Sequence, residues 1–206
     1  MLGNKQIRCY NVNDCIAFRK TSDQYCGLSN MEPKYSISIN NTKILTSEAL
    51  YQSCRFPHNP EIQKLIIGQR SPMLAKEISR QHMKLTRSDW DDERVNIMRW
   101  VLRAKLVCNW KTFGELLDST GEKNIVEDSN RDTFWGAIRT NDTFWGVNAL
   151  GRLLMQLRAQ YRYLNGHTSI TLSPPEINNF FFLGLAMPLI SVDTTIPLDV
   201  ENIWLW

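Results

Sequence analysis

The stretch IVEDSNRDTFWGAIRTNDTFWGVNALGRLLMQLR, residues 125–158, decides the fold of this chain. Its first two residues are apolar and predict a short buried strand that delivers Glu127 and Asp128 to its end. Asp132 and Trp135 follow on a predicted loop. Because functional side chains are often carried by a loop on a rigid scaffold, we expect this loop to contribute to a site.

A strongly amphipathic helix is predicted after Gly146, and Asn148 is expected to cap its first turn. Apolar residues recur along it at helical spacing: Leu150, Leu153, Leu154, Leu157 and Tyr161. Such a helix buries one face and thereby holds the preceding loop against the core. The pentapeptide DTFWG occurs at residues 132–136 and again at 142–146, which is too close a spacing for a solenoid unit and indicates a local duplication.

The remainder of the chain predicts more helices and few strands. Residues 35–45 alternate between apolar and polar side chains around Asn40-Asn41, which predicts a β-hairpin. Thr46 is expected to cap a helix that runs to residue 56, with Glu48 in its first turn. Further helices are predicted to start near Asn59-Pro60, Ser71-Pro72, Ser88 and Thr112. We therefore predict an α+β fold, a helix-rich single domain with a β-hairpin and short strands.

A length of 206 residues allows one domain with a sizeable core. We assign residues 1–165 to this domain, because the composition shifts to Pro, Ser and bulky apolar residues beyond Gly166. Residues 166–206 are too apolar for a disordered linker, and they end in Ile203-Trp-Leu-Trp206. We expect this C-terminal extension to pack on the domain or on a partner.

Composition narrows the class of protein. The net charge of +3 is too small to indicate nucleic-acid binding by itself. The five cysteines are odd in number and form no CxxC pair, which argues against a disulfide framework and a zinc site and favours a reduced compartment. Neither a leader peptide nor a segment long enough to span a bilayer is evident, so we expect a cytoplasmic protein without membrane contact. No metal or other cofactor is predicted.

Carboxylates and indoles are the best candidates for chemistry. They are Glu48, Glu127, Asp128 and Asp132, with Trp90, Trp135 and Trp145. Cleavage of an N-glycosidic bond builds positive charge at the anomeric carbon, which a carboxylate stabilises while an acid protonates the departing nitrogen. Indoles can stack on a base. Structural roles explain the same residues, since the helix dipole favours Glu48 in a first turn, tryptophans anchor cores, and Lys105 can extend past an apolar neighbour.

Motifs in a fixed order favour the functional interpretation. They include TSEALYQ at 46–52, SP at 71–72, AK at 75–76, WD at 90–91, Lys105, TG at 120–121, IVEDS at 125–129, DTFWG at 132–136 and GVNALG at 146–151, followed by LM at 154–155 and Arg158. In this order and spacing, from about residue 16 to residue 162, the chain resembles the NADAR family. The spacing to Gly146 and Asn148 assigns the family motif to the first DTFWG copy.

The resemblance implies an N-glycosidase. YbiA-like members act on phosphorylated ribosylaminopyrimidine intermediates of riboflavin synthesis, whereas members associated with DarT-type toxins remove ADP-ribose from guanine in DNA or nucleotides. Ala49 and Arg55 stand where the YbiA-like pattern has His and Lys, so the second branch is the closer one. We expect ADP-ribosylated guanine as substrate and a DarT-type transferase as a possible partner, with the chain as its antitoxin. The alternatives are the riboflavin reaction and a non-catalytic module that binds ADP-ribose.

The resemblance also implies roles for individual residues. Glu48 is the first choice for general acid or base, and Asp132 and Glu127 hold the ribose hydroxyls or stabilise the cation. Lys76 or Lys105 is a candidate for a Schiff base with the opened sugar. The residues implied in substrate binding are Asn30, Tyr51, Gln52, Arg55, Trp90, Trp135, Gly136 and Asn148.

Overall fold

The computed structural model describes residues 6–19 and 23–194. The α-helices of this part are α1 (Ser47–Ser53), α2 (Pro60–Ile67), α3 (Pro72–Gln81), α4 (Trp90–Cys108), α5 (Trp110–Asp118) and α6 (Ala149–Leu164). The strands are β1 (Arg8–Asn11), β2 (Cys15–Phe18), β3 (Ile37–Ile39), β4 (Thr42–Ile44), β5 (Asn124–Glu127), β6 (Ile138–Thr140), β7 (Thr143–Gly146), β8 (Ser169–Leu172), β9 (Phe181–Phe182), β10 (Leu185–Ala186) and β11 (Ile190–Asp193). This confirms the predicted helix-rich α+β fold.

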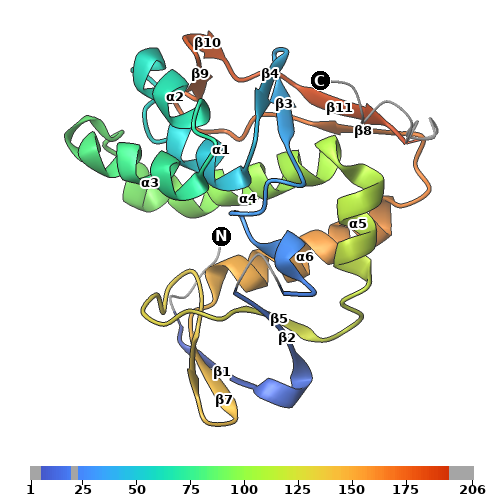
Figure 1. Cartoon of the computed structure of the whole chain (residues 1–206). Coiled ribbons are helices and arrows are strands. Elements are labelled where there is room, and N and C mark those ends of the chain that lie inside the picture. The colour runs from blue at the N-terminus through green and yellow to red at the C-terminus, as the bar shows by residue number, and fades with distance from the viewer. Residues whose placement is uncertain (1–5, 20–22, 195–206) are drawn as a thin grey trace.

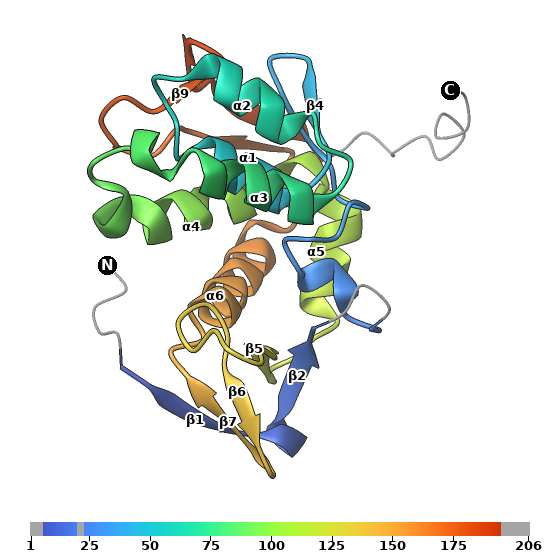
Figure 2. The same cartoon turned by 60° about the vertical axis from the view of Figure 1, so that its left-hand side comes forward.

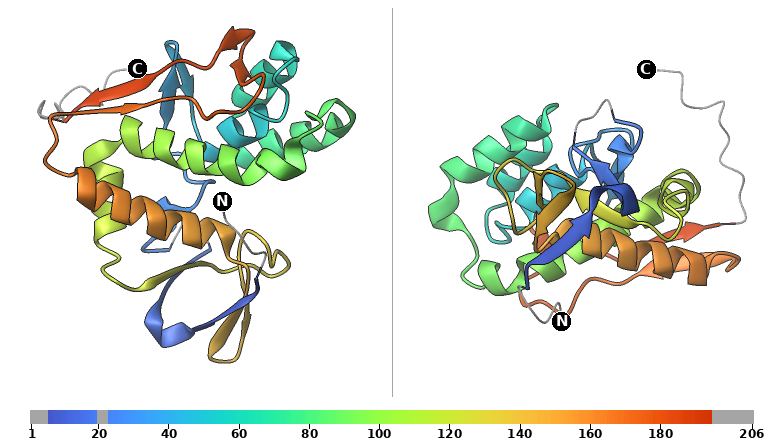
Figure 3. Two further views of the ribbon diagram at one scale, coloured as in Figure 1. Left: turned by 180° about the vertical axis from the view of Figure 1, so that it is seen from behind. Right: turned by 90° about the horizontal axis from the view of Figure 1, so that it is seen from below.

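Helix α4 is the centre of the molecule (Figure 1). It contacts α1, α5 and α6, and strands β8 and β11 lie along it (Figure 3). Figure 2 shows α6 between these elements and the strands β1, β2, β5, β6 and β7. The apolar face predicted for α6 is buried, as Leu150, Leu153, Leu154, Leu157 and Tyr161 all belong to the main core. The predicted hairpin is confirmed as β3 and β4, which are joined through Asn40 and Asn41, both with positive φ.

The predicted strand after residue 124 is confirmed as β5, which pairs in parallel with β2 and packs against α6. The two elements approach so closely that a Cβ on Gly151 would lie 2.1 Å from the carbonyl oxygen of Ile125. Asn148 also belongs to this contact, because its Nδ2 donates to Ile125 O at 2.8 Å and its Oδ1 accepts from Glu127 N at 3.2 Å. Asn148 is the N-cap residue of α6, as predicted, but its side chain makes no capping hydrogen bond because it is bound to β5.

Two other predicted helix starts shift. α4 begins at Trp90 with Asp89 as its N-cap, and α5 begins at Trp110, ahead of the predicted start at Thr112. Trp110 is buried and packs on Tyr161 of α6 at 5.0 Å between ring centroids, so tertiary contact rather than a capping box fixes this end of α5.

Residues beyond 165 add to the same core. Ile170, Phe180, Phe182, Met187 and Ile190 are buried in the main cluster. Polar contacts fix them on the helices as well: Gln63 Nε2 donates to Phe181 O at 3.0 Å, and Trp100 Nε1 donates to Ser173 O at 3.0 Å. The apolar run at residues 203–206 lies outside the described residues. In the described part, no helix combines the length and the apolar character needed to cross a membrane.

Candidate active site

A cavity of about 410 Å³ lies between α1, the N-terminal half of α4, Lys76 of α3, the segment 29–31 and the loop that follows β5. In Figure 2 that loop, in yellow, faces the green helices across this region. The cavity is lined by ten of the thirteen site residues implied by the sequence: Asn30, Glu48, Tyr51, Gln52, Arg55, Lys76, Trp90, Glu127, Asp132 and Trp135. Residues separated by about 100 positions in the chain therefore meet in one place.

Glu48 enters the cavity from the first turn of α1. The predicted cap is confirmed, since Thr46 Oγ1 accepts from Ala49 N at 3.2 Å. The Glu48 residue is only 6% exposed. Its Oε1 accepts from Gln52 Nε2 at 2.8 Å and lies 3.7 Å from Lys76 Nζ. Both partners stabilise negative charge on this carboxylate.

Glu127, at the end of β5, has different surroundings. Burial raises the pKa of its carboxyl to about 7, and the negative charges of Asp132 and Glu48 act in the same direction. A substantial fraction of Glu127 is therefore protonated near neutral pH. One carboxyl of the cavity thus has an amide donor and a lysine beside it, while burial and neighbouring negative charge favour the protonated form of the other, which is an arrangement typical of acid–base pairs.

Asp132 shapes the loop that closes this side of the cavity. Its Oδ1 accepts from the backbone N–H groups of Phe134 at 2.8 Å and Trp135 at 2.9 Å, and its own N–H donates to Ser129 Oγ at 2.9 Å. Gly136 follows where a Cβ would be 2.5 Å from Glu127 O. Gly136 thus permits close packing of the loop on β5 and does not line the cavity.

The aromatic wall is packed more tightly than an open stacking platform. Trp90 is 7% exposed, its ring centroid lies 5.0 Å from that of Tyr51, and the Arg55 guanidinium lies over its ring at 4.4 Å. Trp135 meets Tyr51 edge-on at 5.8 Å and is only partly buried. Of the two indoles expected to stack on a base, Trp135 is the more accessible.

Three predicted site residues do not line the cavity, namely Gly136, Asn148 and Lys105. Asn148 is 0% exposed and bound to β5, so its side chain has no access to a ligand there. Lys105 is also 0% exposed, and its Nζ donates to Gly27 O at 2.6 Å and Ser29 O at 3.1 Å. Burial lowers its pKa to about 7. In this arrangement Lys105 supports the chain that leads to Asn30, whereas Lys76 lines the cavity.

Asn30 is fixed from both sides. Its backbone oxygen accepts from Glu48 N at 3.0 Å, and its Nδ2 donates to Met98 Sδ at 3.2 Å. Asn30 lines the cavity, and its buried Oδ1 has no hydrogen-bond partner among the described residues. A buried acceptor without a partner is costly, so this oxygen is suited to receive a donor from a ligand.

The cavity also contains residues that the sequence analysis missed, of which Arg94 carries the most obvious chemistry. It lies on α4 four residues after Trp90 and four before Met98, and all three line the cavity. This spacing places them on one face of the helix, and it is the signal in the sequence that could have identified Arg94.

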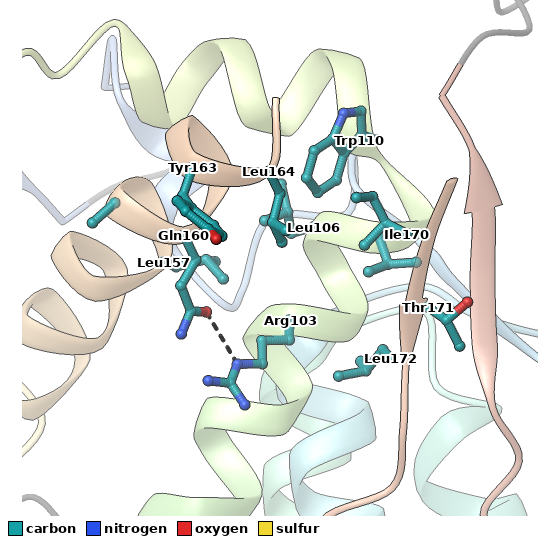
Figure 4. A pocket seen from close by; sticks show the side chains of 12 residues that line it. Arg103, Leu106, Trp110, Leu157, Gln160, Tyr163, Leu164, Ile170, Thr171 and Leu172 are labelled. Carbon is teal, nitrogen blue, oxygen red and sulfur yellow. Dashed lines mark hydrogen bonds between the residues drawn. The ribbon is translucent and has the colours of Figure 1, made fainter. Parts of the chain in front are cut away.

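A second hollow, of about 520 Å³, lies between α4, α6 and β8 (Figure 4). It is mostly apolar, and its one charged lining residue is Arg103, whose Nε donates to Gln160 Oε1 at 3.1 Å. It contains no carboxyl group and thus cannot supply the pair of carboxyls found in the first cavity. Across residues 6–19 and 23–194, no group of three or more His, Cys, Asp or Glu side chains is arranged to hold a metal ion.

Comparisons with known proteins identify the family of this chain. The model of the NADAR domain matches residues 17–162, which confirms the family inferred from the motifs. The chain is 31% identical over 157 residues to a riboflavin biosynthesis protein of Vibrio vulnificus, with 74% of this chain and 41% of that protein covered. It thus spans less than half the length of that relative.

Two other relatives are matched over most of their length. One is an N-glycosidase of Nostoc punctiforme, 32% identical over 157 residues, with 75% of this chain and 97% of that protein covered. The other is the Escherichia coli protein YbiA, whose NMR structure superposes with a TM-score of 0.63 at 32% identity and covers 74% of this chain and 89% of that chain.

Proposed function

Because this chain belongs to the NADAR domain family, we propose that it is an N-glycosidase that hydrolyses the bond between the anomeric carbon of ADP-ribose and the exocyclic nitrogen of guanine. One observation carries the proposal: Glu48 and Glu127 line one cavity, Glu48 beside an amide donor and Lys76, and Glu127 in surroundings that raise the pKa of its carboxyl. The N-glycosidase name of the Nostoc relative supports the reaction class. The departures Ala49 and Arg55 support the guanine branch of the family.

The two carboxyls divide the work of the reaction. As the bond to the base breaks, positive charge develops at the anomeric carbon, and the carboxylate of Glu48 stabilises it and then accepts a proton from the attacking water. Glu127 donates its proton to the departing nitrogen. This refines the sequence analysis, in which Glu48 alone was the first choice for acid or base. Asp132 holds the loop and maintains the raised pKa of Glu127.

A lysine route remains a competing mechanism. Lys76 is the lysine that lines the cavity, and its amine would attack the anomeric carbon and form an imine with the opened sugar as the base departs. Water would then hydrolyse the imine. Borohydride added during turnover separates the routes, because it reduces an imine to a stable adduct on Lys76 and leaves no adduct in the direct reaction.

A second candidate substrate is a phosphorylated ribosylaminopyrimidine, which the name of the Vibrio relative favours. The decisive experiment offers the purified protein an oligonucleotide with ADP-ribosylated guanine and, separately, the small phosphate. Release of ADP-ribose supports the first substrate, and turnover of the pyrimidine alone contradicts it. Tight binding without turnover of either would indicate a non-catalytic reader.

Variants test the assigned roles. Glu127→Gln and Glu48→Gln should each lower kcat by about a hundredfold or more, as expected when a general acid or base is removed. Glu77→Gln is the control, because Glu77 lies on α3 and pairs with Arg80 outside the cavity. Wild-type turnover by either cavity variant would remove that residue from its role. If the partner proposal holds, co-expression of the chain should relieve the toxicity of a DarT-type transferase, and the Glu127→Gln variant should not.

A further inference from the structure

Two arginines that line the cavity each lie over an aromatic ring. The guanidinium carbon of Arg55 lies 4.4 Å from the ring centroid of Trp90, and that of Arg94 lies 4.2 Å from the ring centroid of Phe134. Both arginines line the same cavity. Stacking of this kind fixes the plane of a guanidinium and leaves the N–H groups at its edge free to bind.

These N–H groups lack partners. The Nε atoms of Arg55 and Arg94 are both buried, and neither has a hydrogen-bond partner among the described residues. Within residues 6–19 and 23–194, neither guanidinium lies within ion-pair distance of a carboxylate, whereas Lys76 in the same cavity is paired with Glu48. Burial lowers the pKa of Arg55, whereas the negative charges of Glu48 and Asp91 act in the opposite direction. Both guanidinium groups thus line the cavity without a direct ion pair among the described residues.

We propose that Arg55 and Arg94 form an anion subsite that binds the phosphate carried by the ribose whose glycosidic bond is cleaved. A phosphate group supplies several acceptor oxygens, and a guanidinium can bind two of them at once. The inference rests on the proposed function for the identity of the sugar, but the anion subsite itself rests on the arrangement of the two arginines.

The anion subsite would orient the substrate in the cavity. Carboxyl groups from Glu48, Glu127 and Asp132 repel a phosphate and attract the cationic sugar of the transition state, while the arginines do the reverse. A phosphorylated ribosyl substrate is therefore oriented with its anomeric carbon toward the acids. A ribosyl compound without phosphate leaves the two guanidinium groups buried without an anion and should be a poor substrate. The cavity consequently selects phosphate esters of ribose, whether a monophosphate or a pyrophosphate.

Binding of simple probes tests the subsite without catalysis. By calorimetry or ligand-observed NMR, ribose 5-phosphate and ADP-ribose should bind the wild-type protein, and ribose should bind about tenfold more weakly or worse. Stronger binding of ADP-ribose than of ribose 5-phosphate would identify a pyrophosphate as the preferred group, and the reverse would identify a monophosphate; either supports the subsite. Equal binding of ribose and its phosphate would overturn it.

Arg94→Gln should weaken the binding of ribose 5-phosphate by about tenfold and leave the binding of ribose unchanged. Arg99→Gln is the matched control on the same helix, because Arg99 does not line the cavity and its NH1 donates to Asn96. Thermal melts of both variants establish that they are folded. An unchanged affinity of folded Arg94→Gln for the phosphate would contradict the proposal, and Arg55→Gln provides an independent repeat.

The outcome is separable from that of the proposed function. One possible result is that no ribosyl substrate is hydrolysed, while ribose 5-phosphate binds and Arg94→Gln weakens this binding. The enzyme assignment then fails and the anion subsite stands. If hydrolysis occurs and neither arginine substitution raises KM for the phosphorylated substrate, the subsite fails and the enzyme assignment stands.

Discussion

Raising the pH from 7 to 9 should stabilise this protein through Lys105. The pKa of this fully buried lysine is lowered from 10.5 to about 7. Between these two values the unfolded chain binds a proton at this position and the folded chain does not, so the free energy of unfolding rises with pH. The stability is fully present above the unfolded pKa and is lost as the pH falls through the folded value of about 7.

The size of the effect follows from the two pKa values. A full proton difference contributes about 1.4 kcal/mol per pH unit, and at pH 7 the folded lysine is about half protonated, so the gain from pH 7 to pH 9 is about 2 kcal/mol. Other groups titrate in this range. Burial raises the pKa of Cys54 to about 12, so ionisation of this thiol in the unfolded chain lowers stability as the pH approaches 9. The quantity to measure is therefore a difference between wild type and Lys105→Met.

Urea denaturation followed by tryptophan fluorescence at several pH values provides this difference. The free energy of unfolding of the wild type should gain about 2 kcal/mol relative to Lys105→Met between pH 7 and pH 9. Lys111→Met, at an exposed position of α5, should keep the wild-type dependence. Parallel stability curves for wild type and Lys105→Met would refute the reasoning, because they would mean that Lys105 has the same proton affinity in both states.

Other predictions concern the cavity and its support. Asp132→Asn keeps the acceptor that holds the loop but removes a charge that raises the pKa of Glu127, so the loss of kcat/KM at high pH should move to lower pH in a pH–rate profile. Asn148→Ala leaves a buried donor and acceptor of β5 without partners and should cost about 2 to 4 kcal/mol in urea denaturation. Gly151→Ala places a methyl group against Ile125 O and should lower stability by about 1 to 3 kcal/mol or more, measured as a lower Tm.

Local sequence signals predicted the elements that carry the acids. Thr46 caps α1 and places Glu48 in its first turn, as expected from its spacing. The apolar pair before Glu127 forms the buried strand β5. Both predictions succeed because capping and short-range apolar patterning act between residues close in the chain. The identity of the family also followed from the order of motifs, and the match to the NADAR domain confirms it.

The contacts that individual polar side chains make could be known only from the tertiary structure. Asn148 is the N-cap residue that the sequence predicted, but its side chain binds β5. Lys105 was a candidate nucleophile, but it donates to the backbone oxygens of Gly27 and Ser29. Arg94 was not among the predicted site residues, yet it lines the cavity and lies over the ring of Phe134.

The sequence by itself thus determined the helix-rich α+β class, the hairpin, the buried face of α6, and the helix α1 and strand β5 that hold Glu48 and Glu127. Only the tertiary structure decided which charged groups share a cavity, which are ion-paired and which are buried without a partner. The physical reason is that burial and pairing depend on contacts between residues far apart in the chain, such as Lys76 with Glu48 or Arg94 with Phe134, and spacing along one helix or strand does not encode them.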